Sequence, residues 1–178
     1  LAAGSGSIFQ ICKAFRNSEL GRLHNPEFSI LEWYRVGFSL HQLMDEVTEL
    51  IVEVLQDDCK FKKIKKISYS ELFEQHTGLN PLQFCQQQYN AYAEKYLIAD
   101  AIHLCGDDHS MWLDFIFSHK VQPILEMQSL YLVYGYPAIQ SSLARINKKN
   151  PEIADRFEVF INGIEIGNGF FELADGNE

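Results

Sequence analysis

The pattern of apolar and polar residues near the start of the chain predicts two strands. Residues 7–15 form an apolar run rich in β-prone side chains, and residues 28–34 alternate in character. Side chains alternate between the two faces of a strand, so one face of the second strand carries Phe28, Ile30, Glu32 and Tyr34. A carboxylate and a phenol on a face that also holds apolar side chains favour a binding role over simple packing.

The loop that joins these strands runs from Arg16 to Phe28 and is polar. It carries Arg22, His24 and Asn25, and Pro26 stiffens its return. A hairpin needs only about two to five residues to reverse the chain. A longer loop with several cationic and amide side chains predicts that an anion is held there.

Helices are predicted in the middle of the chain. The strongest helical period runs from Leu40 to Val54, and Ser39 with Gln42 forms a capping box at its start. Three more helices are expected, over Ser68 to His76 ending at Gly78, from Pro81 to Leu104, and over residues 110–120 behind the capping pair Asp107 and Asp108. The basic run at residues 60–66 is expected to be a solvated loop, with a binding patch as the alternative.

Strand-like sequence returns near the end of the chain, around the dipeptide Asn162-Gly163. This dipeptide predicts a two-residue hairpin turn, because both central residues need positive φ. A regular register pairs Phe160 with Glu165 and Glu158 with Gly167. Glu158 and Glu165 then share one face, with backbones about 7–8 Å apart, and can grip the same Mg²⁺. A solvated sheet face is the alternative for this pair.

Composition bounds the class of protein. The chain has 178 residues, 47% hydrophobic and 22% charged, which suits one domain with a substantial core. Hairpins and helical blocks without βαβ alternation predict an α+β fold, an antiparallel sheet flanked by helices. The net charge of −9 argues against a protein that wraps nucleic acid on its own surface.

Cysteines and histidines give no sign of a special site. The scattered thiols of Cys12, Cys59, Cys85 and Cys105 are expected to be buried rather than paired. The spacing of His103, His109 and His119 favours structural or surface roles over metal binding. No apolar run approaches about 18 residues and no signal-peptide pattern is present, so a cytoplasmic protein without a membrane span is expected.

Several segments carry a resemblance to a known family. GRLHNPEFSILEWYR (residues 21–35) resembles motif 2 of class II aminoacyl-tRNA synthetases of the lysyl group. Trp33 and Arg35 resemble the short paralogues in that group, which attach a lysine-type amino acid to elongation factor P. VYGYPAIQSSLARI (residues 133–146) and RFEVFINGIEIGNGFFEL (residues 156–173) resemble later parts of the same domain.

The resemblance implies part of a class II catalytic domain over residues 1–178. Motif 2 would lie at residues 7–37, a helical insertion at about 61–122, and a hairpin with the amino-acid pocket at residues 129–175. The implied activity is activation of lysine or a lysine isomer by ATP and Mg²⁺ as an aminoacyl-adenylate, followed by transfer to a lysine side chain of elongation factor P.

The resemblance also assigns site residues. ATP would be bound by Arg16, Asn17, Ser18, His24, Asn25, Phe28, Glu165 and Ile166. Within that set, Arg16 is the catalytic clamp on the α-phosphate or on the carboxylate of the amino acid, because its forked donors match either. Phe28 would stack on adenine or belong simply to the core. Mg²⁺ would be held by Glu158 and Glu165. The lysine pocket would consist of Glu32, Tyr34, Asn168, Phe170 and Glu172, because a buried ammonium needs anionic partners.

The parity of the last strand adds a condition to this assignment. Glu165 has an odd number, whereas Asn168, Phe170 and Glu172 have even numbers, so a regular strand would split them between two faces. If all serve one pocket, the strand must slip by one residue. Gly167 and Gly169 mark the region where a bulge is easiest.

The chain also departs from the family pattern. Ser18 stands where most relatives have the glutamate that meets the adenine amino group, so adenine recognition is expected to be weaker or rerouted. Motif 1, which forms the family's homodimer interface, and motif 3, with its second phosphate-binding arginine, are not found. Two alternatives therefore stay open: a lysyl-tRNA synthetase fragment that charges tRNA, and a truncated, non-catalytic module that binds lysine or a nucleotide.

Overall fold

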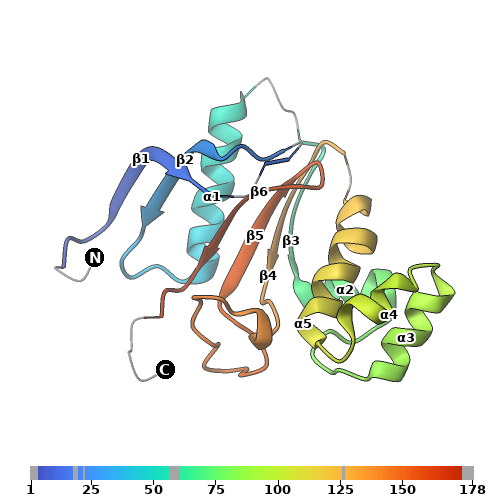
Figure 1. The fold of residues 1–178 in the computed structure, drawn as a ribbon. Coiled ribbons are helices and arrows are strands. Elements are labelled where there is room, and N and C mark those ends of the chain that lie inside the picture. The colour runs from blue at the N-terminus through green and yellow to red at the C-terminus, as the bar shows by residue number, and fades with distance from the viewer. Residues whose placement is uncertain (1–3, 18–19, 22, 57–60, 126, 174–178) are drawn as a thin grey trace. The chain divides into compact units, whose positions relative to one another are not determined.

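The computed structural model describes residues 4–17, 20–21, 23–56, 61–125 and 127–173 (Figure 1). The chain divides into two compact units, Leu1–Leu43 and Met44–Glu178. Each unit is described by itself below.

The first unit is built on an antiparallel hairpin. Strand β1 (Ile8–Phe15) pairs with β2 (Glu27–Tyr34) in a register that runs from Ile8 opposite Tyr34 to Phe15 opposite Glu27. Both strands are where the sequence predicted them. The pairing is extended past the strands by the Arg16 amide, which donates to the Pro26 carbonyl at 2.9 Å.

Helix α1 (Leu40–Leu55) begins in the first unit and continues into the second. The Ser39 amide donates to Oε1 of Gln42 at 2.8 Å, and the Gln42 amide donates back to the Ser39 hydroxyl at 3.3 Å. This reciprocal pair is the predicted capping box. It satisfies backbone donors that the first turn of a helix leaves without intrahelical partners.

The second unit contains a four-stranded sheet in the order β3-β4-β5-β6. Its strands are β3 (Lys63–Ser68), β4 (Ser129–Tyr134), β5 (Arg156–Ile161) and β6 (Ile164–Phe170). The pairs β4–β5 and β5–β6 are antiparallel, whereas β3 runs parallel to β4. Helices and two sheets in one chain confirm the α+β class, but the four-stranded sheet is mixed rather than wholly antiparallel.

Strand β3 corrects two expectations. The basic run was expected to be a solvated loop, and residues 61–122 a helical insertion, yet this segment begins with a strand. Ile67 is buried in the core, whereas the three lysines of this edge strand are half-buried and Ile64 is exposed. The sequence gives no period-two signal here, because Ile64 and Ile67 are three residues apart and lie on opposite faces of the strand.

Four α-helices lie between β3 and β4 in the described part of the chain. They are α2 (Tyr69–Thr77), α3 (Gln86–Lys95), α4 (Asp100–Cys105) and α5 (His109–Ile116), and α5 continues into a π-helical turn, Phe117–Val121. The predicted caps are confirmed for α2 at Ser68 and Gly78, and for α5 at Asp108, whose side chain accepts from the Met111 amide.

The helix expected from Pro81 to Leu104 was wrong in two respects. The Asn80 side chain accepts from the Leu82 amide at 2.9 Å and makes a turn there, so α3 starts only at Gln86. A second break follows at Leu97, which has a φ of 57° and separates α3 from α4. Residues on both sides of Leu97 are typical of helices, so the sequence showed neither the end of α3 nor the start of α4.

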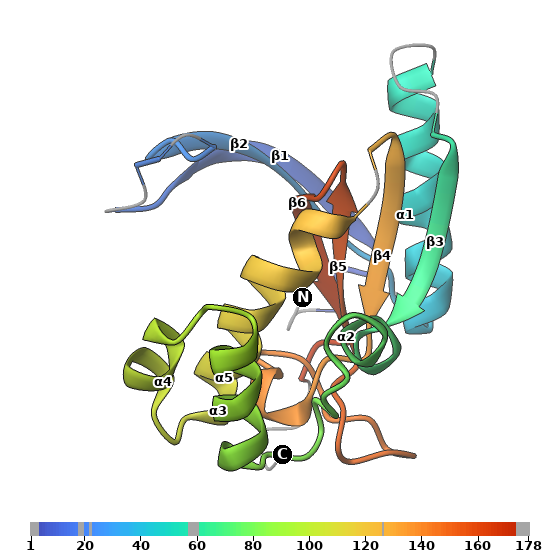
Figure 2. The same cartoon turned by 90° about the vertical axis from the view of Figure 1, so that its right-hand side faces the viewer.

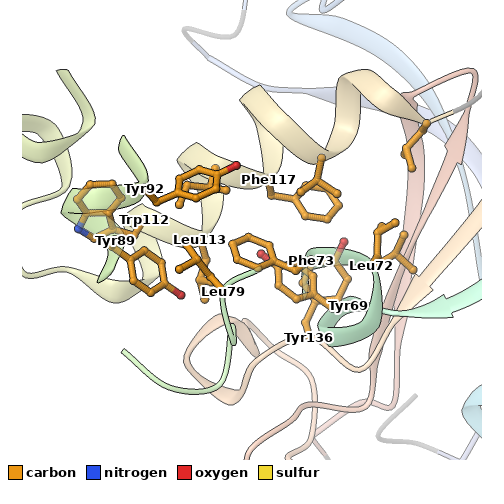
Figure 3. Close-up of a cluster of buried hydrophobic side chains, with 14 of the residues drawn as sticks. Tyr69, Leu72, Phe73, Leu79, Tyr89, Tyr92, Trp112, Leu113, Phe117 and Tyr136 are labelled. Carbon is orange, nitrogen blue, oxygen red and sulfur yellow. The ribbon is translucent and has the colours of Figure 1, made fainter. Parts of the chain in front are cut away.

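The core of the second unit lies between this helical block and one face of the sheet (Figure 3). Ile67, Val133 and Phe160 contribute to it from three strands, and Trp112 and Phe73 from the helices. Figure 2 shows the helical block and α1 on opposite sides of the strands. An ion pair between Lys66 and Asp45 joins β3 to residues 44–55 of α1 on that opposite side.

Candidate functional site

Glu32 is held in a defined orientation on the first hairpin. Gln10 lies opposite it on β1 and donates to Oε2 at 2.8 Å, and the Tyr34 hydroxyl donates to Oε1 at 2.5 Å. The hydrogen bond from Tyr34, and then that from Gln10, hold the pKa of the Glu32 carboxyl below its ordinary value. At neutral pH the side chain is therefore an oriented anion, suited to a cationic ligand group.

The loop between β1 and β2 borders a small, open pocket beside Arg16. This pocket, of about 350 Å³, is lined by Arg16, Leu20, Gly21 and His24. Gly21 and His24 exchange backbone hydrogen bonds of 3.0 and 3.3 Å, which fold the loop back on itself. The Arg16 guanidinium lies over the Phe28 ring, 5.3 Å from its centroid. A cation, a histidine and an aromatic ring thus meet within one hairpin.

The β5–β6 hairpin turns at Asn162 and Gly163, with φ of 54° and 75° as predicted. Ile161 pairs with Ile164 and Phe160 with Glu165, also as predicted. The register then shifts, so that Val159 pairs with Gly167 and Glu158 with Asn168. The expected pairing of Glu158 with Gly167 was wrong, because Ile166 is an extra residue on β6 at this point.

This slip by one residue is the irregularity that a shared pocket for Glu165 and Asn168 needs. Directly paired residues share a face, so Glu165, Asn168 and Phe170 all lie on the face that carries Glu158. The bulge begins at Ile166, immediately before Gly167, where the absence of a side chain makes an irregular strand easiest. Glu172 follows the end of β6, in an isolated bridge with Ala144.

Glu158 belongs to a network that the sequence did not reveal. Its carboxylate is buried, accepts from the Tyr136 hydroxyl at 2.6 Å and forms an ion pair with Arg156. Arg156 also donates to the Gln140 carbonyl at 2.6 Å and lies over the Tyr136 ring. Arg156 stands two residues before Glu158 on the same strand, so its side of the sheet was predictable, whereas Tyr136 comes from a loop.

A pocket of about 560 Å³ opens next to this network. Its wall includes Glu158 and Glu165 from the sheet and Asp114 from α5. Gln140 links the two sides, because its Nε2 donates to Oδ1 of Asp114 at 2.7 Å. Neither Asp114 nor Gln140 was predicted, since a single carboxylate in a helix and an amide in a short 3₁₀ helix carry no distinctive spacing.

The predicted site residues are divided between the two units. The first unit brings together Arg16, His24 and Phe28, and places Glu32 beside Tyr34; Asn17 and Asn25 are exposed in the loop, and Ser18 lies outside the described residues. The second unit brings Glu158, Glu165, Asn168 and Phe170 to one sheet face. That all of them line a single cleft stays a prediction, as does the sharing of a Mg²⁺ ion by Glu158 and Glu165.

The expectation of buried cysteines can be compared with the structure. Cys85 is half-buried and Cys105 buried, but Cys12 is exposed on the hairpin, contrary to the expectation of buried thiols; Cys59 lies outside the described residues. Among the residues that are described, no group of three or more His, Cys, Asp and Glu could hold a metal ion. Within the same part of the chain, every helix is too short or too polar to cross a membrane.

Comparisons with known proteins identify the family to which this sequence is similar. The sequence model of the class II tRNA synthetases (D, K and N) matches residues 1–178. The chain is 46% identical to an elongation factor P–(R)-β-lysine ligase of Photobacterium profundum, over the whole chain and 54% of that relative. Ligases of the same name from Pectobacterium carotovorum and Pasteurella multocida are 43% and 42% identical, again over the whole chain and 53% of each relative. The chain therefore spans about half the length of these relatives.

Proposed function

Because the chain belongs to the class II tRNA synthetases of the D, K and N group, we propose that it forms part of the catalytic domain of an ATP-dependent lysine ligase. The substrate is lysine or a lysine isomer, and the acceptor is a lysine side chain of elongation factor P. The names of the similar ligases support this choice of acceptor over tRNA.

The observation that carries the proposal is the oriented carboxylate of Glu32. A substrate with two amino groups needs anionic partners, since an unpaired ammonium in a closed pocket is expensive. Glu32 is ionised, and Gln10 and Tyr34 fix its two oxygens. Asn168 and Phe170, on the face of β6 that the slip creates, supply the polar and apolar contacts for the rest of the amino acid, and Glu172 binds the other amino group.

In the first step an oxygen of the lysine carboxylate attacks the α-phosphorus of ATP, the bond to the bridging oxygen breaks, and pyrophosphate leaves. Two anions must be brought together, so the site needs fixed positive charge at the phosphate. Arg16 provides it in the loop pocket, with His24 and Asn25 nearby, and Phe28 stacks on adenine. Asn17, Ser18 and the Glu165–Ile166 segment complete the nucleotide site.

Mg²⁺ commonly binds through one or two carboxylates together with substrate phosphates. Glu165 offers an exposed carboxylate for this role, and Glu158 lies on the same sheet face. The ion would neutralise phosphate charge. Glu158 is already engaged by Arg156 and Tyr136, so its direct contact with the ion would compete with these two partners.

In the second step the acceptor amine attacks the carbonyl carbon of the adenylate, and the bond to the phosphate oxygen breaks. AMP leaves and the nitrogen loses a proton, which completes an amide bond. The chain's own residues bind and orient both partners, which is how most of the barrier in such a transfer is lowered.

Lysine-dependent exchange of pyrophosphate into ATP, measured on the full protein, tests the first step. Glu32→Ala is expected to abolish exchange, because loss of the anion should cost about 3–5 kcal/mol of amino-acid binding. The matched control is Glu27→Ala, which removes a carboxylate from the opposite face of the same strand, where it pairs with Lys13. If Glu32→Ala exchanged pyrophosphate as fast as an active Glu27→Ala variant, Glu32 would not be a binding residue for the substrate.

A further inference from the structure

Glu172, the proposed ligand of one lysine amino group, lies beyond the paired part of β6. Asn168 and Phe170 are fixed by their pairing with Glu158 and Arg156 of β5, and that register ends at Phe170. Glu172 is exposed and follows the strand. A carboxylate binds a substrate ammonium best when it is held in place beforehand, because ordering it during binding costs free energy. The position of Glu172 therefore needs contacts outside the β5–β6 pairing.

Three residues from separate segments meet beside Glu172. Arg145 lies in the connection between β4 and β5, Asp155 directly precedes β5, and Phe171 directly follows β6. Their backbones form a closed cycle of hydrogen bonds. The Arg145 amide donates to the Phe171 carbonyl at 2.9 Å, the Phe171 amide to the Asp155 carbonyl at 2.8 Å, and the Asp155 amide to the Arg145 carbonyl at 2.9 Å. Together these three residues form the β6 clamp.

The side chains of the β6 clamp reinforce this cycle. The Arg145 guanidinium donates to Oδ2 of Asp155 through Nε at 3.2 Å and through Nη2 at 2.7 Å. Its Cζ lies 3.6 Å from the centroid of the Phe171 ring. Asn147 donates to Oδ1 of Asp155 at 2.6 Å, so both oxygens of this buried residue are bound. A planar guanidinium that is bound along its edge and packed on its face has little freedom to move.

The backbone of Glu172 is held on both sides. Glu172 forms an isolated antiparallel bridge to the connection that carries Arg145. The hydrogen bond from Arg145 to Phe171 flanks this bridge on one side, and the Leu173 amide flanks it on the other by donating to the Leu143 carbonyl at 3.4 Å. Neighbouring side chains of an extended segment point to opposite sides, so Phe171, packed on Arg145, turns Glu172 the other way. That is the side of the lysine-pocket residues of β6.

We propose that the β6 clamp positions Glu172 for the amino-acid substrate, with Arg145 as its central positioning residue. The inference rests on the proposed function, because it assigns the residues that hold one of the amino-acid ligands in place. Arg145 touches no substrate in this role and acts through Phe171 and Glu172. The two amino groups of α-lysine and β-lysine are separated by different numbers of carbon atoms. A carboxylate in a fixed place should therefore also discriminate between these isomers.

Lysine-dependent pyrophosphate exchange by the full protein, with KM and kcat determined separately, tests this role. Phe171→Leu removes the ring that packs on the guanidinium but leaves the ion pair between Arg145 and Asp155, and Phe171→Tyr keeps a ring. We expect Phe171→Leu to raise the KM for lysine about tenfold with little change in kcat, as for a weakened charge-assisted contact. Phe171→Tyr should behave like the wild type. The ratio of the KM values for α-lysine and β-lysine should move toward one in Phe171→Leu.

Arg145→Met and Lys148→Met form a matched pair. Each removes one cation from the same connection, and Lys148 is exposed and outside the β6 clamp. Arg145→Met should raise the KM for lysine as Phe171→Leu does, whereas Lys148→Met should leave it unchanged. Amide hydrogen exchange, followed by NMR, shows whether the clamp has opened. The amides of Phe171 and Leu173 should exchange faster in Arg145→Met and at the wild-type rate in Lys148→Met.

The outcomes separate this inference from the proposed function. A wild-type protein without lysine-dependent exchange would overturn the proposed function, and this inference with it. Wild-type KM values and isomer ratios in the folded Phe171→Leu and Arg145→Met variants would overturn the inference alone. A raised KM in Arg145→Met with unchanged amide exchange would also overturn it, because Arg145 would then act by its charge and not by holding Glu172. If Arg145→Met does not fold, Phe171→Leu decides the question, since Phe171 is 36% exposed and the ion pair is kept.

Discussion

Gly169 and Gly167 offer a matched test of how the β5–β6 hairpin is packed. A Cβ added to Gly169 would lie 2.5 Å from both Cε1 and Cζ of Phe157, whose side chain is buried. A Cβ added to Gly167, two residues earlier on the same strand, would meet no atom within 4 Å. Neither glycine has positive φ, so the two alanine variants differ in available space and not in backbone strain.

Gly169→Ala should therefore destabilise the protein, because the Phe157 ring must move out of a closely packed site. Overpacking of this kind costs about 1–3 kcal/mol. For a protein of this size that corresponds to a melting temperature lower by about 2–12 °C. Gly167→Ala should be neutral or stabilising by up to about 1 kcal/mol, since alanine restricts the unfolded chain.

Thermal and urea unfolding followed by circular dichroism measure both variants. In a Phe157→Leu background the cost of Gly169→Ala should fall, since the ring that creates the conflict is gone. The same displacement should raise the apparent KM for lysine, as Gly169 stands between Asn168 and Phe170 of the predicted pocket. Equal stability of Gly169→Ala and Gly167→Ala would refute the packing argument.

Three further outcomes follow from the described contacts. Tyr34→Phe should raise the pKa of Glu32 toward its ordinary value, which carboxyl ¹³C NMR measures. Because the pKa of Glu32 is lowered in the folded protein, the stability that this residue contributes is present at neutral pH. That stability is lost as the pH falls through the folded-state pKa. Asp108→Ala should remove the N-cap of α5 and lower the unfolding free energy by about 1 kcal/mol in urea titration. Arg156→Met should cost about 3–5 kcal/mol by the same measurement, because the buried Glu158 carboxylate loses its cationic partner.

Each of these outcomes can fail in a specific way. An unchanged Glu32 titration in Tyr34→Phe would show that the 2.5 Å hydrogen bond is not formed in solution. A stable Asp108→Ala would mean that the α5 amides find other acceptors. A stable Arg156→Met would indicate that the ion pair with Glu158 does not stabilise the folded protein.

Elements with a local cause were predictable from the sequence. The Ser39 capping box, the Ser68 and Gly78 caps of α2 and the Asn162-Gly163 turn depend on residues that contact one another within a few positions. Strand β3 was missed for a different reason. Pairing with β4, which lies far along the chain, makes residues 63–68 a strand, and no local pattern reports such a partner.

The functional face shows how a local rule and a nonlocal requirement combine. Period-two alternation alone would place Glu165 and Asn168 on opposite sides of the sheet, and the family resemblance alone would place both in one site. Both conditions hold only if an extra residue lies between them, and Ile166 is that residue. The Arg156–Glu158–Tyr136 network and the pocket at Asp114 had no comparable signal, because their members come from a strand, a loop and a helix. Features that depend on three separate elements can be found only once those elements are placed in space.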